Sequence, residues 1–142
     1  MIRVKRIYSH ESRCKGKCFL VDRLLPRGIK KEALRIDGWL KEVAPSQELR
    51  LWFGHEAKKW RAFWSRYFAE LDAKPNSWQR LVKAAAKGDV TLLFAASDVN
   101  YTNAIALKEY LELKLKKKWV TELFKFFLHP TFQMRILPFI LV

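Results

Sequence analysis

Short apolar runs along the chain alternate with longer segments in which apolar residues recur every three or four positions. Residues 1–8 alternate apolar and basic side chains, which predicts a first strand. Residues 18–22 (CFLVD) and 90–96 (VTLLFAA) are continuous apolar runs, typical of strands buried on both faces. The second run is apolar except for Thr91, so we expect helices on both sides of the sheet. Residues 36–46 are ambiguous, and we favour a strand there.

Four helices are predicted between and after these strands. Ser46 is placed to cap a short helix that ends at Gly54. A third helix would be capped by Asn76 or Ser77 and end at Gly88, and a fourth would bury Ala104, Leu107 and Leu111. The second helix carries an aromatic stripe, interpreted as core packing rather than a base-stacking surface. The stripe consists of Ala57, Trp60, Trp64, Tyr67, Phe68 and Leu71.

The order of these elements predicts the fold class. A strand, a polar turn and a helix follow one another within a dozen residues after position 90, which is half of a βαβ unit. Half of the 142 residues are apolar and 30% are charged, which is a globular composition. We therefore expect an α/β protein. Residues 1–115 would form a single compact domain with a small, mostly parallel sheet flanked by helices, and residues 116–142 an apolar, helical C-terminal extension.

Polar side chains gather where two of the predicted strands end. Asp22, Arg23, Arg27 and Gly28 follow the first apolar run, and residues 97–103, with Asp98 and Asn103, follow the second. Ligands of open α/β sheets bind outside the carboxyl ends of the strands, so these loops are predicted to share a crevice, which His10 could join. Arginine forks, a glycine and a helix N-terminus suit an anion, phosphorylated or nucleotide-like.

Other interpretations of these residues stay open. Asp22 and Arg23 could simply pair with each other or cap turns, and Asn100 and Asn103 could cap the helix that follows. His55 could serve as a general base, or as a partly buried cap beside Trp52 and Phe53. No nucleophile–base pair is evident, so the sequence decides neither whether a reaction occurs nor which cofactor would take part.

Three residues have a spacing that could suit a metal. His10, Cys14 and Cys18 follow the pattern H-x3-C-x3-C, but a fourth ligand with sensible spacing is missing, so we predict no metal site. A disulfide across this short turn is not expected in a reducing compartment. The N-terminus is basic and lacks a long apolar core, which favours a cytoplasmic protein.

The chain is strongly basic, with 28 basic and 14 acidic residues and a net charge of +14 spread over its length. Such a surface attracts polyanions, so nucleic acid is a possible partner. A lysine-rich surface with few Asn and Gln residues is also common in heat-adapted proteins. Charge alone does not choose between these explanations.

Three segments resemble the YeaO-like branch of the domain of unknown function 488 family. They are LVDRLLPRGIKKE, WLKEVAPSQELRLWFGHEAKKWRAFWSRYFAEL and TLLFAASDVNYTNAIALKEYL, and the resemblance spans roughly residues 2–113. It implies a compact α/β domain and no known activity. Leu25 stands where the family usually has Trp, and Ser97 where it usually has a basic residue. The family's polar signature falls on Asp22, Arg23, Pro26, Arg27, Gly28, Ser46, Trp52, His55, Asp98 and Asn103.

The resemblance also implies that the family ends near residue 115. Val120, Leu123, Phe124, Phe127 and Leu128 then form an apolar helical face, with Pro130 ending the helix. Charged residues and prolines argue against a membrane span, and an interfacial helix is a second possibility. We expect this extension to pack on its own domain or, more simply, on a second copy, giving a homo-oligomer.

Overall fold

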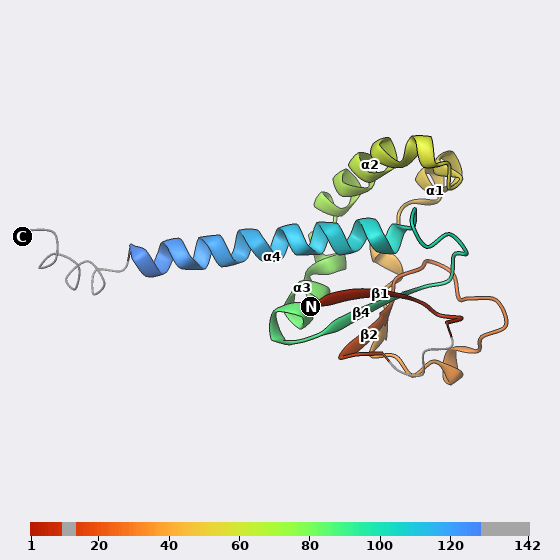
Figure 1. Ribbon diagram of the computed structural model, residues 1–142, viewed down its shortest axis with the longest axis horizontal. Helices are drawn as coiled ribbons and strands as arrows, with labels where there is room; N and C mark the ends of the chain where they lie inside the picture. The colour runs from red at the N-terminus through yellow and green to blue at the C-terminus, as the bar shows by residue number, and fades with distance from the viewer. Residues whose placement is uncertain (10–13, 129–142) are drawn as a thin grey trace, which may run out of the picture.

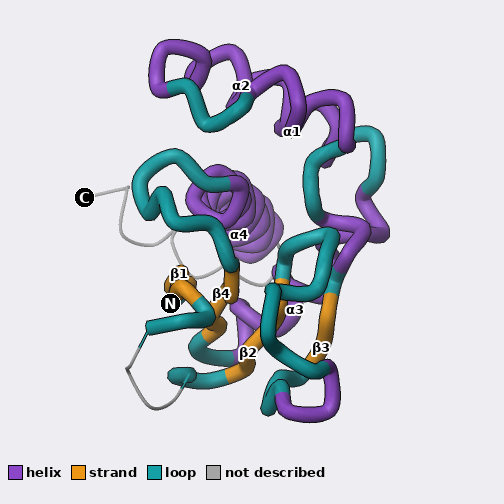
Figure 2. Tube along the Cα trace, turned by 90° about the vertical axis from the view of Figure 1, so that its right-hand side faces the viewer, coloured by secondary structure: helices purple, strands orange, loops and turns teal. Residues whose placement is uncertain are grey.

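Four parallel strands form one sheet in the order β1–β4–β2–β3 (Figure 1; all four strands are labelled in Figure 2). The computed structural model describes residues 1–9 and 14–128. His10 and Pro130, for which the sequence predicts roles, lie outside the described residues, as does the side chain of Phe127. The strands are β1 (Ile2–Arg6), β2 (Lys17–Leu20), β3 (Gly38–Trp39) and β4 (Val90–Phe94). The predicted α/β class with a small parallel sheet is thus confirmed.

The helices follow the predicted order. They are α1 (Gln47–Phe53), α2 (Trp60–Asp72), α3 (Pro75–Lys87) and α4 (Asn103–Phe127), with short 3₁₀ turns η1 (Lys31–Ala33), η2 (Lys41–Val43) and η3 (Ala57–Lys59). The ambiguous segment 36–46 contains both the short strand β3 and the 3₁₀ turn η2. Viewed nearly along α4, the helix lies between the sheet and the α1–α2 pair (Figure 2).

Strand β4 is the centre of the sheet and is buried along its whole length. Val90, Leu92 and Phe94 belong to the main core, together with residues of the helices. Leu93 points to the other face, where it meets Cys18 and Leu20. That second face is covered by loop residues including Leu25, Leu34 and Ile36, so the expectation that helices cover both sides is wrong. Apolar loop side chains exclude water there as a helix would.

Helix α1 has the predicted capping residues at both ends, whereas the start of α3 differs from the prediction. The Ser46 hydroxyl accepts the Leu49 N–H at 3.1 Å, and Gly54 ends α1 with a φ of 52°, as predicted. Helix α3 begins at Pro75, so neither Asn76 nor Ser77 caps it. Proline is favoured in the first turn because its missing N–H has no partner to lose there.

The aromatic stripe of α2 packs in the core, as expected, but its most buried residues are not the tryptophans. Phe63 and Tyr67 are almost fully buried, whereas Trp60, Trp64 and Phe68 are only partly buried. The Tyr67 hydroxyl donates to the carbonyl oxygen of Val43. Arg61, in the same helix, is exposed. Phe63 was missed because the neighbouring tryptophans dominate the helical pattern.

Helix α4 has a packed half and a projecting half (Figure 1). Ala104, Leu107, Tyr110 and Leu111 are buried against the sheet and the other helices. Residues 116–126 are all exposed, although the helix continues without a break through the boundary predicted near residue 115. The division into domain and extension remains a prediction. No helix of the described chain is both long and apolar enough to cross a membrane.

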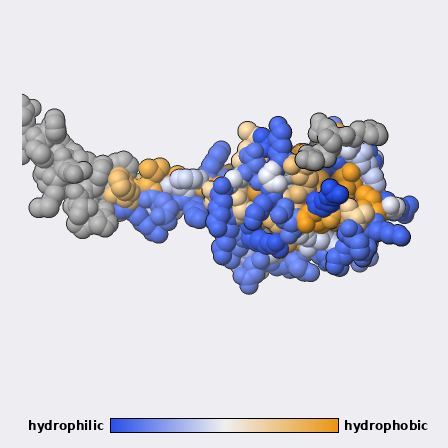
Figure 3. Space-filling model, turned by 90° about the horizontal axis from the view of Figure 1, so that it is seen from below, coloured by the Kyte–Doolittle hydropathy of each residue, from blue (hydrophilic) through white to orange (hydrophobic). Residues whose placement is uncertain are grey.

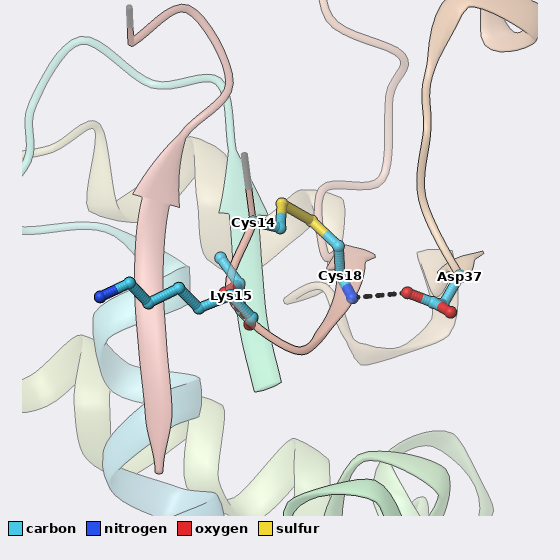
Figure 4. Close-up of a disulfide and its surroundings, with 5 residues drawn as sticks. Cys14, Lys15, Cys18 and Asp37 are labelled. Atoms are coloured by element: carbon cyan, nitrogen blue, oxygen red, sulfur yellow. Dashed lines mark hydrogen bonds between the residues drawn. A yellow bond between two sulfur atoms is a disulfide. The ribbon is translucent and has the colours of Figure 1, made fainter. Parts of the chain in front are cut away.

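The turn before β2 contains a disulfide between Cys14 and Cys18, contrary to the expectation that no bridge would form (Figure 4). A tight turn brings the two Cα atoms to 5.9 Å, a normal separation for a disulfide. The Cys18 N–H donates to the Asp37 carboxylate at 2.8 Å, and the Thr91 hydroxyl donates to the Lys15 carbonyl oxygen at 2.8 Å. These bonds fasten the turn to the sheet.

Gly16 within this turn is predicted to be irreplaceable. Its φ is +71°, and a Cβ built there would lie 2.0 Å from the carbonyl oxygen of Asp89. Gly16→Ala should therefore lower the free energy of unfolding by about 2 kcal/mol or more. Gly88→Ala is the control, because a Cβ at Gly88 meets no atom within 4 Å and its backbone is extended. Chemical denaturation of both variants checks the prediction, and equal losses would contradict it.

Candidate functional site

A cleft of about 830 Å³ lies at the carboxyl ends of β1, β2 and β4. Because neighbouring parallel strands end at the same edge, the loops that follow them meet there. Five predicted site residues line it, namely Asp22, Arg23, Arg27, His55 and Asn103, whereas Gly28 and Asp98 do not. The other lining residues are Arg6, Tyr8, Leu24, Leu25, Pro26, Ala44, Pro45, Arg50, Leu51, Phe53, Phe63, Ala95, Ala96 and Ser97.

Asp22 ties together the loops that form the cleft floor. One carboxylate oxygen accepts the Ala95 N–H at 2.7 Å, and the other accepts the Asn103 side-chain amide at 3.5 Å. Its backbone carbonyl accepts the Trp39 indole N–H at 2.7 Å. The pKa of the Asp22 carboxyl is raised by burial, against the opposing effects of the two hydrogen bonds and the Arg50 charge. This carboxylate therefore has a structural task, holding three segments in register.

Arg23 extends along the cleft wall with an unsatisfied donor. One terminal nitrogen donates to the Ala44 carbonyl oxygen at 3.3 Å. Its Nε is buried and has no hydrogen-bond partner among the described residues. Arg23 and Asp22 are adjacent in sequence, yet no ion pair joins them in the described part of the chain. The interpretation that they merely pair with each other is therefore wrong.

Three further arginines surround the cleft. The Arg6 Nε donates to the Ala96 carbonyl oxygen at 3.0 Å, and its guanidinium lies 5.3 Å from the Tyr8 ring centroid. The Tyr8 hydroxyl donates to the carbonyl oxygen of Arg27 at 2.8 Å, which joins the loops after β1 and β2. Arg50 comes from α1 and is exposed. Four arginines thus face one aspartate, and none of the four forms an ion pair with another described residue.

His55 enters the cleft on a strained turn. Its φ is 58°, in the left-handed region that non-glycine residues rarely occupy. The ring Nδ1 lies 3.2 Å from the Tyr101 carbonyl oxygen, and the ring packs at 5.5 Å from that of Phe53. Both contacts hold the imidazole at the rim. His55 is exposed, so the interpretation as a partly buried cap is wrong in its burial. Its use as a general base stays a prediction.

Asp98 closes a turn beside the cleft. Its Oδ1 accepts the N–H groups of Asn100 at 2.8 Å and Tyr101 at 3.1 Å. These two bonds, with a smaller contribution from the charge of His55, lower the pKa of the Asp98 carboxyl. Thr102 rather than Asn103 caps α4, because its hydroxyl accepts the Ile105 N–H at 3.3 Å. The side chain of Asn103 is thus available to hold Asp22.

Sequence reasoning missed Arg6, Tyr8 and Arg50. Arg6 is the last residue of β1, so the rule that ligands bind at strand ends could have found it. Arg50 sits within α1, and nothing in the local pattern indicates which way it faces. Leu25 and Ser97, the two departures from the family pattern, both line the cleft. The wall of this cleft therefore differs from the one that the resemblance implies.

The donor set favours anion binding over metal binding. Arginines supply only hydrogen-bond donors, and no cluster of three or more His, Cys, Asp and Glu residues exists among the described residues. Asp22 and His55 are the ionisable groups that could accept a proton, and neither is hydrogen bonded to a hydroxyl or thiol in the described structure. The described lining is therefore rich in hydrogen-bond donors of positive charge, which is the chemistry that anions need.

Opposite pKa shifts at Asp22 and Asp98 predict opposite dependences of stability on pH. A raised pKa in the folded state means that the folded protein holds the proton more tightly than the unfolded chain does. The Asp22 carboxyl therefore lowers the free energy of unfolding as pH rises from 3.8 through its raised pKa. Asp98 contributes stability that is lost as pH falls below 3.8, through its lowered pKa.

The measurement is denaturant unfolding of wild type, Asp22→Asn and Asp98→Asn across this pH range. With rising pH, the Asp22→Asn protein should gain stability relative to wild type, whereas Asp98→Asn should lose it. The asparagine at position 22 keeps an oxygen to accept the Ala95 N–H. Slopes of the same sign for the two variants would contradict the assignment.

Comparison with known proteins places the chain in a family. The sequence profile described as the inactive DUF488-N3 subclade, DUF488-N3i, matches residues 1–123. Uncharacterized protein YeaO of Escherichia coli is 40% identical over 110 residues, which cover 78% of this chain and 96% of that protein. Uncharacterized protein Rv3073c of Mycobacterium tuberculosis is 36% identical over 110 residues, covering 78% and 92%. No solved structure matches significantly. Over its α/β domain and the cleft, the chain belongs to the DUF488-N3i family.

Proposed function

We propose that the cleft binds a small anionic ligand, phosphorylated or nucleotide-like. The observation that carries this proposal is the Arg23 guanidinium, whose buried Nε has no described hydrogen-bond partner. A buried donor without an acceptor costs free energy, because it has lost its hydrogen bonds to water. A phosphate or carboxylate oxygen would supply the acceptor, and a charged acceptor makes the stronger bond.

The surroundings of Arg23 support the same ligand class. Arg6, Arg27 and Arg50 add positive charge, and Asp22, the only carboxylate among the described lining residues, is engaged by Ala95 and Asn103. The cleft also receives the N-terminal end of α4, whose dipole favours negative charge. Leucine, proline and phenylalanine side chains between the arginines suit a ligand that carries an apolar or aromatic group beside its anion.

We place this role in the cytoplasm and describe it as binding rather than catalysis. The family is described as inactive, and the cleft offers no nucleophile paired with a base among its described residues. The left-handed backbone of His55 is the kind of strain that folded proteins keep at ligand sites. A binding role needs His55 only as a hydrogen-bond donor at the rim.

The test is thermal unfolding of the protein titrated with inorganic phosphate, sulfate and adenosine monophosphate. A ligand at a hundredfold excess over its Kd should stabilise the folded state by about 2.7 kcal/mol. Arg23→Ala and Arg50→Ala should each weaken binding about tenfold or more, because each removes a charged hydrogen-bond donor. Arg61→Ala is the matched control, since Arg61 carries the same charge but lies exposed on α2, outside the cleft.

Equal weakening by all three substitutions would contradict a specific cleft and indicate attraction by the net charge of +14. That outcome would favour the alternative of nucleic-acid binding over the basic surface. It would then be accompanied by affinity for oligonucleotides that falls steeply with salt concentration. The affinity of a cleft ligand, by contrast, should depend only modestly on salt. It should fall in the Arg23→Ala and Arg50→Ala proteins but not in the Arg61→Ala protein.

A further inference from the structure

The projecting half of α4 exposes apolar side chains that nothing in the described structure covers. Trp119 is 63% exposed, Val120 53%, Leu123 53%, Phe124 64% and Leu128 68%. Single exposed apolar residues are ordinary on protein surfaces, but a contiguous row of this size marks a binding surface. Figure 3 shows hydrophobic residues gathered on the projecting helix beside hydrophilic ones.

The row covers a wide part of the helix surface. At 3.6 residues per turn, these five side chains span roughly half of the circumference. Glu122 and Lys125 occupy the opposite side, where Lys125 pairs with Glu122 at 3.3 Å, and Thr121 lies at the edge of the row next to Leu128. Lys116, Lys117 and Lys118 precede the row and are exposed. This combination of Trp, Phe and Leu on one face with lysines beside it is typical of helices that lie in a membrane interface.

We propose that residues 116–128 bind the surface of a membrane that contains anionic lipids. The apolar face would enter the boundary between headgroups and acyl chains, and the lysines would contact the lipid phosphates. Since no described helix is long and apolar enough to span a bilayer, the helix lies on the surface. The projecting geometry keeps the folded domain from blocking the approach (Figure 1).

Charge favours a lipid surface over a second copy of the chain. Four lysines and one glutamate give residues 116–128 a net charge of +3, and the whole chain carries +14. Two such molecules repel each other, whereas an anionic bilayer attracts each of them. Two helices that pack against each other also bury only a narrow stripe of each helix, so a dimer would leave part of this wide apolar face in water. Self-association through the extension, expected from the sequence, is therefore an outcome of the test.

The experiment is sedimentation of the full chain with vesicles of phosphatidylglycerol and phosphatidylcholine in equal amounts, and with vesicles of phosphatidylcholine alone. We expect binding to the mixed vesicles and much weaker binding to the neutral ones. Phe124→Glu and Leu123→Glu each place a carboxylate in the apolar face. Thr121→Glu is the matched control, because it makes the same charge change in the same helix without removing an apolar side chain of the row.

One unit of lost positive charge should weaken binding about fivefold at most, and this applies to all three variants. Phe124→Glu and Leu123→Glu should lose about tenfold more, because an apolar side chain no longer enters the bilayer. All three positions are exposed and outside the core, so the thermal unfolding midpoints should equal that of wild type. The cleft arginines are untouched, so this result does not depend on the proposed ligand.

Several outcomes would overturn the proposal. Equal loss in the Thr121→Glu and Phe124→Glu proteins would mean that the basic charge alone attracts vesicles. Equal binding to neutral and mixed vesicles would remove the role of anionic lipid. Failure of wild type to bind any vesicle would assign the face to another occupant. Light scattering would then show a dimer that Phe124→Glu dissociates, or a monomer whose own residues 129–142 cover the face.

Discussion

The parallel pairing of β4 with both β1 and β2 is the constraint on which the cleft depends. Because all three strands run the same way, their carboxyl ends lie at one edge, and three loops far apart in sequence meet there. Asp22 secures this meeting by accepting hydrogen bonds from Ala95 and Asn103. A buried carboxylate is costly unless it is hydrogen bonded, so its two partners are needed to hold it.

In the cleft, the Asp22 carboxylate has its hydrogen-bond partners, whereas the Arg23 guanidinium lacks one among the described residues. The Asp22 carboxylate accepts a hydrogen bond from the backbone of another loop, while the buried Nε of Arg23 has no described hydrogen-bond partner. The imbalance of four arginines to one aspartate follows from residues on separate elements, β1, the loop after β2 and α1. Such an arrangement carries unfavourable desolvation and repulsion between like charges. This imbalance is the physical basis of the anion-binding role that we propose.

Packing on the sheet is asymmetric, and this shapes the rest of the molecule. One face of the sheet buries the large side chains of α2 and α4, including Phe63, Tyr67 and Leu107. The other face is sealed by loop residues and by a turn closed with the Cys14–Cys18 disulfide. Core packing stops at Leu115, yet α4 continues, because helical hydrogen bonds are local and need no tertiary support once a helix has begun.

The family match extends beyond the point where core packing ends. The profile of the DUF488-N3i family ends at residue 123, within the projecting half of α4. The part of this chain that the profile matches therefore includes the sheet, the cleft loops and the packed half of α4. Trp119, Val120 and Leu123 of the apolar row also fall inside the profile, whereas Phe124 and Leu128 lie beyond it.

The sequence by itself determined the elements, because local rules govern them. The buried strand at 90–94, the Ser46 cap, the Gly54 stop and the aromatic helix all follow from periodicity and terminal residues. It also predicted that Asp22 and Asn103 would meet, since parallel strands share an edge. Only the tertiary structure decided that Arg6 and Arg50 line the same cleft, that Asp98 serves a turn and that loops cover one sheet face. The reason is that the direction in which a side chain points across space depends on how distant elements pack, and no local pattern encodes that packing.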